Sequence, residues 1–208
     1  MKTSLVNWLL VLFVSFSWGA SFMFTRLVVV EVSPSHLVSI RLLLASLLLG
    51  PLFINKEEFM KMTKVIPSLM LLGVINEALP FFIFAWSAQD LTAGMLSILN
   101  GTSPLFALII AIILFGQNTT FLQVIGLLMG FLGLIIFIGI EEIGLVFFPV
   151  TLCLIGAFCY AYSNNVLFNL SHIKSSALAS ATMTVSYAHL RAHETSLHLV
   201  CRLLLEKK

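Results

Sequence analysis

The sequence predicts an all-α polytopic membrane protein, and both its composition and its pattern of apolar runs support that prediction. Of its 208 residues, 60% are hydrophobic and 10% are charged. A soluble domain carries about 25% charged residues, so this chain has too little polar surface to cover a water-soluble globule. The apolar residues fall in long runs that are separated by short polar breaks.

Six of these runs are long enough to cross a bilayer, because a spanning helix needs about 20 mostly apolar residues. The breaks between them are short, which predicts that consecutive helices are antiparallel neighbours. Residues 175–184 are predicted to begin a seventh helix. The six predicted spans cover roughly residues 5–26, 35–54, 65–87, 91–115, 120–140 and 144–168.

The distribution of basic residues predicts the orientation of the chain. Short cytoplasmic loops carry an excess of Lys and Arg. A cytoplasmic N-terminus places Lys2, Lys56, Lys61, Lys64 and Lys174 on the inner side. We therefore expect the N-terminus to be cytoplasmic.

Two ionisable residues, Arg41 and Glu77, fall inside predicted spans. Each costs about 2.5–3.5 kcal/mol at membrane depth, so each needs a partner or a wet cavity. One hypothesis is that Glu77 faces a central cavity and binds a proton or a cationic substrate. The alternative is a structural ion pair between Glu77 and Arg41 on adjacent helices.

Two prolines, Pro80 and Pro104, fall mid-span. A proline in a membrane helix frees a backbone carbonyl, which is tolerated where neighbours or water satisfy it. For Pro104 that carbonyl belongs to Asn100, so "NGTSP" (100–104) predicts a kinked, polar cavity wall, or else a kink that only shapes packing. The residues we expect to line a substrate cavity are Trp18, Arg41, Asn76, Glu77, Asn100 and Pro104.

The sequence contains no motif that would support catalysis or cofactor binding in residues 1–184. HExxH, GxSxG, Walker loops and paired-carboxylate metal sites are all missing from it. We therefore expect neither an enzyme nor a resident cofactor or metal.

Several ordered segments resemble an EamA-type repeat of the drug/metabolite transporter superfamily. They are "WGASFMFTR" (18–26), "VSPSHLVSIRLLLASLLLGPL" (32–52), "ALPFFIFAWSAQDLTAGMLSILNGTSPLFALIIAIILFGQ" (78–117) and "QVIGLLMGFLGLIIFIG" (123–139). The resemblance covers nearly all of residues 8–140. Gln117 departs from the family, which commonly has Glu there, and Glu77 is not a general family feature.

The resemblance implies ten spans in two inverted five-helix repeats, and carriage of small metabolites or drugs, often by exchange or proton coupling. Residues 1–140 would form the first repeat and residues 141–184 the start of a second. An odd number of spans per repeat inverts the second copy in the membrane, as in many secondary transporters.

Residues 185–208 change character abruptly and resemble the in-frame translation of a sequencing adapter, so we expect them to be non-native. His189, His193, His198 and Cys201 have spacings that could otherwise suit zinc. Residues 1–184 hold seven Lys+Arg and seven Asp+Glu, so the formal net charge of +2 comes from this tail. The charge therefore gives no reason to expect a nucleic-acid partner.

The sequence is therefore interpreted as part of a secondary transporter of a prokaryotic inner membrane, with the lipid bilayer and an unidentified small organic solute as its partners. The truncated chain itself is expected to be inactive. Two alternatives stay open. One is a short membrane protein that dimerises to transport, and the other is a non-transporting membrane scaffold.

Overall fold

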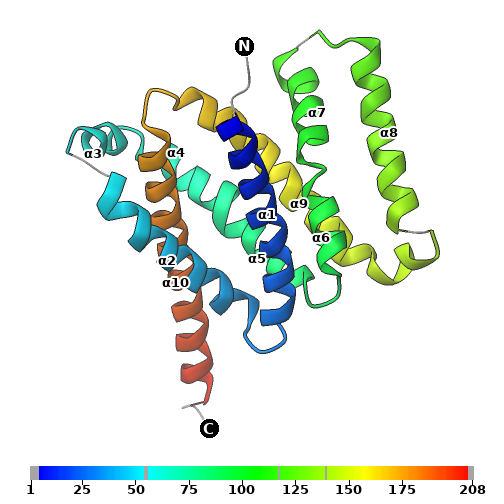
Figure 1. The fold of residues 1–208 in the computed structure, drawn as a ribbon. Coiled ribbons are helices and arrows are strands. Elements are labelled where there is room, and N and C mark those ends of the chain that lie inside the picture. The colour runs from blue at the N-terminus through cyan, green and yellow to red at the C-terminus, as the bar shows by residue number, and fades with distance from the viewer. Residues whose placement is uncertain (1–4, 54–55, 117, 139, 206–208) are drawn as a thin grey trace.

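The described part of the chain is helical throughout. The computed structural model describes residues 5–53, 56–116, 118–138 and 140–205, apart from the side chains of residues 51–53, 115, 138, 140–145, 165, 168–169 and 192–205 (Figure 1). No strand occurs within these ranges, which confirms the predicted all-α class. The elements are α1 (Leu5–Val28), α2 (Pro34–Phe53), α3 (Lys56–Thr63), α4 (Ile66–Leu72), the π-helical turn η1 (Gly73–Ala78), α5 (Leu79–Ser87), α6 (Ala93–Asn100), α7 (Ser103–Phe115), α8 (Phe121–Ile138), α9 (Ile140–Asn169) and α10 (Ser175–Leu205).

Four segments of the described chain are long and apolar enough to cross a membrane. They are Leu5–Val28, Ile66–Ser87, Ala93–Leu114 and Val146–Asn164. Two further predicted spans form shorter apolar helices, Pro34–Gly50 and Phe121–Phe137. The chain is thus an integral, multi-pass membrane protein.

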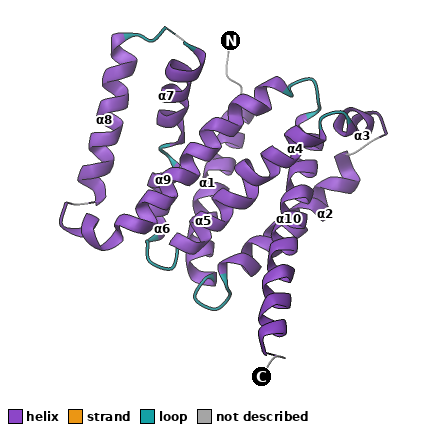
Figure 2. Ribbon diagram, turned by 180° about the vertical axis from the view of Figure 1, so that it is seen from behind, coloured by secondary structure: helices purple, strands orange, loops and turns teal. Residues whose placement is uncertain are grey.

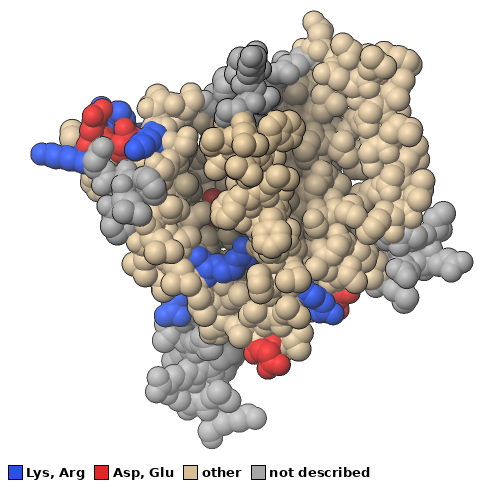
Figure 3. Space-filling view, in the orientation of Figure 1, with Lys and Arg blue, Asp and Glu red and all other residues tan. Residues whose placement is uncertain are grey.

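The helices run alternately up and down, as their short connections predict. Figure 1 and the view from behind in Figure 2 show the 29–33 and 88–92 turns at one end of the molecule. The 116–120 and 170–174 turns lie at the other end, with α3. Figure 3 shows charged side chains gathered at both ends of a largely uncharged surface, with basic atoms also in the middle of this face. That distribution is the one expected of a bundle that lies across a bilayer.

The structure adds detail to the predicted spans and corrects one boundary. The polar segment after α2 forms the short helix α3. The third span is a composite of α4, η1 and α5, and the fourth is interrupted between α6 and α7, where the sequence predicted a kink. The acidic pair at 141–142 was expected to separate two spans, but it lies within α9.

The core forms where α2, α5, α6, α9 and α10 meet. Its fully buried side chains include Val38, Leu42, Leu96 and Cys153. Helix α10 also lies against η1, and a Cβ added at Gly73 would stand 2.9 Å from Cγ1 of Val185. A glycine at position 73 therefore permits this close approach.

Helix α10 continues through Val185 without a break, and Ser186 is buried against η1, where its hydroxyl donates to the Gly73 carbonyl. The predicted non-native origin of residues 185–208 stays a prediction. His193, His198 and Cys201 lie outside the side chains that the structure describes.

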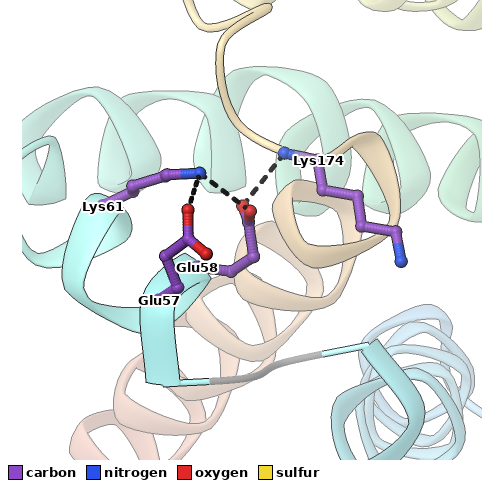
Figure 4. Close-up of polar contacts among 4 residues, drawn as sticks. All are labelled: Glu57, Glu58, Lys61 and Lys174. Atoms are coloured by element: carbon purple, nitrogen blue, oxygen red, sulfur yellow. Dashed lines mark hydrogen bonds and ion pairs between the residues drawn. The ribbon is translucent and has the colours of Figure 1, made fainter.

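Outside the spans, Glu58 ties α3 to the start of α10 (Figure 4). Its Oε2 accepts a hydrogen bond from the backbone N–H of Lys174 at 3.1 Å, and its Oε1 accepts one from Nζ of Lys61, also at 3.1 Å. The same Nζ lies 2.9 Å from Oε1 of Glu57. The Lys174 backbone N–H, followed by the Lys61 ammonium, holds the pKa of Glu58 below its usual range. A carboxylate at the start of α10 also suits the helix dipole.

We expect Glu58→Gln to lower the thermal unfolding temperature of the chain in mild detergent by a few degrees at neutral pH. The lowered pKa means that ionised Glu58 stabilises the fold above the usual carboxyl pKa, and that this is lost as pH falls through the lowered value. The wild-type and variant unfolding temperatures should therefore converge at acidic pH. Glu57→Gln is the matched control, since Glu57 does not contact α10. An equal fall in unfolding temperature in both variants would show that the stabilisation does not come from the contact between Glu58 and the start of α10.

Candidate functional site

A cavity of about 690 Å³ opens between α1, η1, α5, α6, α7, α9 and α10. Five of the six residues predicted to line a substrate cavity lie on its wall: Trp18, Asn76, Glu77, Asn100 and Pro104. They come from three different predicted spans, so the fold brings together side chains that are far apart in the sequence. Trp18 itself is 56% exposed.

Glu77 lies on the π-helical turn η1, and the proline that follows explains why the helix widens there. Pro80 has no N–H to donate to the carbonyl four residues earlier, that of Asn76, and its ring crowds that carbonyl. The Leu79 N–H bonds instead to the Val74 carbonyl, five residues back. Such wide turns inside α-helices occur frequently at functional sites. The turn buries Glu77, which is 6% exposed, against the cavity.

Asn76 connects Glu77 to α9. Its Nδ2 donates to Oε1 of Glu77 at 3.1 Å, and its Oδ1 accepts from Oγ of Ser163 at 2.5 Å. Ser163 is fully buried on α9. The carboxylate is therefore held by a neighbouring amide, and that amide is held by α9, which packs against η1.

The break between α6 and α7 supplies a donor to the carbonyl that Pro104 leaves without its usual backbone partner. That carbonyl belongs to Asn100, and Oγ of Ser103 donates to it at 2.7 Å. Oγ1 of Thr102 donates at 2.6 Å to the Leu99 carbonyl, which also accepts the backbone N–H of Thr102. Asn100 and Pro104 thus belong to an interrupted helix whose polar groups border the cavity, in agreement with the predicted kink.

Arg41, the sixth residue predicted to line the substrate cavity, lies beside this wall and not on it. It borders a neighbouring cavity of about 320 Å³. Its guanidinium donates to Oγ of Ser21 at 3.0 Å and to Oγ1 of Thr25 at 3.3 Å, and it lies 5.1 Å from the ring centre of Phe81. Hydroxyls on α1 and an aromatic face therefore replace a carboxylate as its partners.

The structural ion pair between Arg41 and Glu77, the alternative raised by the sequence, does not form. Among the described residues, ion pairs within 4.0 Å join Lys61 to Glu57 and Glu58, and neither Arg41 nor Glu77 takes part in one. The two charges lie in adjoining cavities whose shared walls are aromatic: Trp18, Phe22, Phe81 and Tyr160.

Five further polar residues border the cavity and were not among the six predicted wall residues: Ser15, Ser97, Ser103, Tyr160 and Asn164. Tyr160 and Asn164 stand out in the sequence as a polar patch, because they are four residues apart and share a face of an otherwise apolar helix. Ser103 belongs to the predicted polar segment 100–104, whereas Ser15 and Ser97 gave no comparable signal, since Ser is common at helix interfaces in membranes. The side chain of Asn165, the next residue, lies outside the described set.

The cavity can offer a carboxylate, amides and hydroxyls to a solute between aromatic walls. A buried carboxylate with one hydrogen bond and no cation within ion-pair distance needs a proton or a positive group to offset its desolvation. Among the side chains that the structure describes, no three His, Cys, Asp or Glu residues come together in an arrangement suited to a metal ion.

The helices and the cavity define a class of protein, a multi-pass membrane protein with a chamber between broken helices that is bordered by aromatic and polar side chains. Comparison with known proteins gives the family. The model of the EamA-like transporter family matches residues 7–139, so the chain belongs to that family, within the drug/metabolite transporter superfamily. Over 130 residues the chain is 22% identical to an uncharacterized transporter of Archaeoglobus fulgidus. The match covers 62% of this chain and 46% of that protein, and no solved structure matches.

We expect Glu77→Gln to leave the thermal unfolding temperature in detergent unchanged or to raise it. The substitution replaces a buried carboxylate that lacks a cation with a neutral amide of the same shape, which removes a desolvation cost. Breaking a true buried ion pair would instead cost about 3–5 kcal/mol. Arg41→Gln should lower stability by about 1–3 kcal/mol, because α1 loses two hydrogen bonds. Strong destabilisation by Glu77→Gln would show that Glu77 is structural.

Proposed function

We propose that this chain is the first part of a secondary transporter that moves a small organic solute through the cavity beside Glu77. The carboxylate takes a proton or the cationic part of the solute during transport. The observation that carries the proposal is the placement of Glu77, which is 6% exposed, borders a 690 Å³ cavity and has no cation within ion-pair distance among the described side chains. Ionisable residues retained at membrane depth typically mark solute or proton pathways.

The broken helices support the same proposal. Substrate sites of many secondary transporters lie near the bilayer midplane, where discontinuous helices expose backbone and polar groups. Here the π-turn η1 and the α6–α7 break both border one cavity. An interrupted helix is tolerated in a membrane only where it lies within protein or lines a wet cavity.

We propose a cytoplasmic N-terminus in a prokaryotic inner membrane. The end of the bundle that holds α3 and the 170–174 turn carries Lys56, Lys61, Lys64 and Lys174. The opposite end carries Arg26, which donates to the Ala88 and Gln89 carbonyls at 2.7 and 2.9 Å. Loops with more lysines stay in the cytoplasm.

The chain spans about half the length of the curated relative it matches. We propose that a second, inverted repeat completes the cavity in the whole protein, after residues 141–184. We expect long-read sequencing of the source DNA across the codon for Thr184 to show a transporter frame that continues for about four more helices, the length of a second repeat. A genomic frame that reads directly into residues 185–208 would contradict this, and would return the dimer and the His/Cys tail to consideration.

The transport test uses vesicles that hold the product of the continuous frame and a mixture of metabolites followed by mass spectrometry. We expect net movement of at least one solute, and loss of that movement in Glu77→Gln. Glu31→Gln, an exposed carboxylate in the 29–33 turn, is the matched control and should transport normally. Vesicles that hold the 208-residue chain alone should transport nothing. Full activity in Glu77→Gln for every solute would overturn the proposal.

A further inference from the structure

We propose that Ser163 is a positioning residue for Glu77, and that Ser163, Asn76 and Glu77 form a hydrogen-bond relay that transmits the charge state of the carboxylate to α9. This inference rests on the proposed function, in which Glu77 binds a proton or a cation. Through the relay, that binding alters the contact between η1 and α9. Glu77 and Asn76 lie on η1, and Ser163 lies on α9, which Figure 2 shows beside α5.

The Ser163 hydroxyl has one hydrogen and two acceptors within reach. Its Oγ lies 2.5 Å from Oδ1 of Asn76 and 2.9 Å from the carbonyl oxygen of Tyr160. The hydrogen can go to only one of them at a time. When it goes to Oδ1, the amide presents Nδ2 to the carboxylate, and the 3.1 Å contact between Nδ2 and Oε1 follows.

A carboxylate can only accept hydrogen bonds, whereas a protonated carboxyl can also donate one. The observed arrangement therefore suits ionised Glu77. After Glu77 takes a proton from water in the cavity, its O–H can donate to Oδ1 once the Asn76 amide has turned over. Nδ2 then donates to Oγ of Ser163, and the Ser163 hydrogen goes to the Tyr160 carbonyl. The Ser163 hydroxyl, one N–H of the Asn76 amide and, when present, the Glu77 O–H each have an acceptor in both states, so the relay has two hydrogen-bonded arrangements.

The hydrogen bonds of this relay are the main short-range contacts that act on the charge of the Glu77 carboxylate. The ionisable neighbours that act on Glu77 from other elements are Arg41 on α2 and Tyr160 on α9, and both act through space. Neither α4 nor α5 contributes a titratable residue to the packing around η1. On α10, the residues that approach η1 at Gly73 are Thr182, Val185 and Ser186, and all three are uncharged.

The charge state of Glu77 can be measured without knowing the solute. A hydrophobic carbodiimide labels protonated carboxyl groups at membrane depth, and mass spectrometry of the peptide reports the labelled fraction. The assay uses the 208-residue chain in membranes at neutral pH, with Glu77→Gln as the blank. We expect Ser163→Ala to raise labelling of Glu77 by up to about tenfold, because the ionised carboxylate loses a fixed charge-assisted donor.

Three comparisons separate positioning from packing. Ser163→Thr keeps the hydroxyl and should label like the wild type. Asn76→Leu should label like Ser163→Ala, and adding Ser163→Ala to it should change nothing further, because Ser163 acts through Asn76. Ser87→Ala is the matched control: Ser87 is equally buried and donates to the Pro149 carbonyl on α9, but it has no link to Glu77.

The proposal is overturned if Ser163→Ala labels like the wild type, if its effect adds to that of Asn76→Leu, or if Ser87→Ala has the same effect. Where Ser163→Ala fails to give a monodisperse protein, Ser163→Cys, which has a weaker donor of similar shape, replaces it and should give an intermediate labelled fraction. Because labelling needs no solute, the relay can fail while transport depends on Glu77, and the transport test can fail while the relay holds.

Discussion

The structure depends on one constraint: every polar group at membrane depth must find a partner within the protein or in trapped water. Pro80 and Pro104 each remove a backbone donor in the middle of a span. At Pro80 the helix responds by widening into η1, and at Pro104 it breaks and Ser103 donates a hydrogen bond to the Asn100 carbonyl that the proline leaves without its backbone partner. Both responses place polar atoms on the same cavity, so the backbone defects create the site.

The two membrane-depth charges follow from the same constraint but are satisfied differently. Arg41 has long reach and several donors, and it joins α1 to α2 through hydroxyls and an aromatic face. Glu77 is short and acceptor-only when ionised, and η1 turns it toward the cavity with one amide as its partner. Arg41 therefore stabilises the contact between α1 and α2. Glu77 has no cation within ion-pair distance among the described side chains, so its carboxylate can still take a proton or a positive group.

Much of the fold could be predicted from the sequence, because long apolar runs and the positions of prolines are local signals. The same holds for Trp18, Glu77 and Asn100, since polar or large aromatic residues inside apolar runs stand out. The π-turn, the separate cavity of Arg41 and the role of Ser163 could not be predicted. These features depend on how helices that are distant in the sequence pack together. The sequence also does not distinguish a serine that only fills space between helices from one that orients a neighbouring side chain.

The proposed site requires water in the chamber beside Glu77, and cysteine accessibility tests this most directly. In a background with Cys153, Cys159 and Cys201 replaced by Ala, Asn100→Cys is treated in membranes with a charged, membrane-impermeant thiol reagent. The matched position is Met129→Cys, on the exposed outer face of α8. Thiols ionise and react only where water reaches them. We expect the reagent to modify position 100 and to leave position 129 unmodified. Equal protection of both positions would show a dry, packed interior and contradict it.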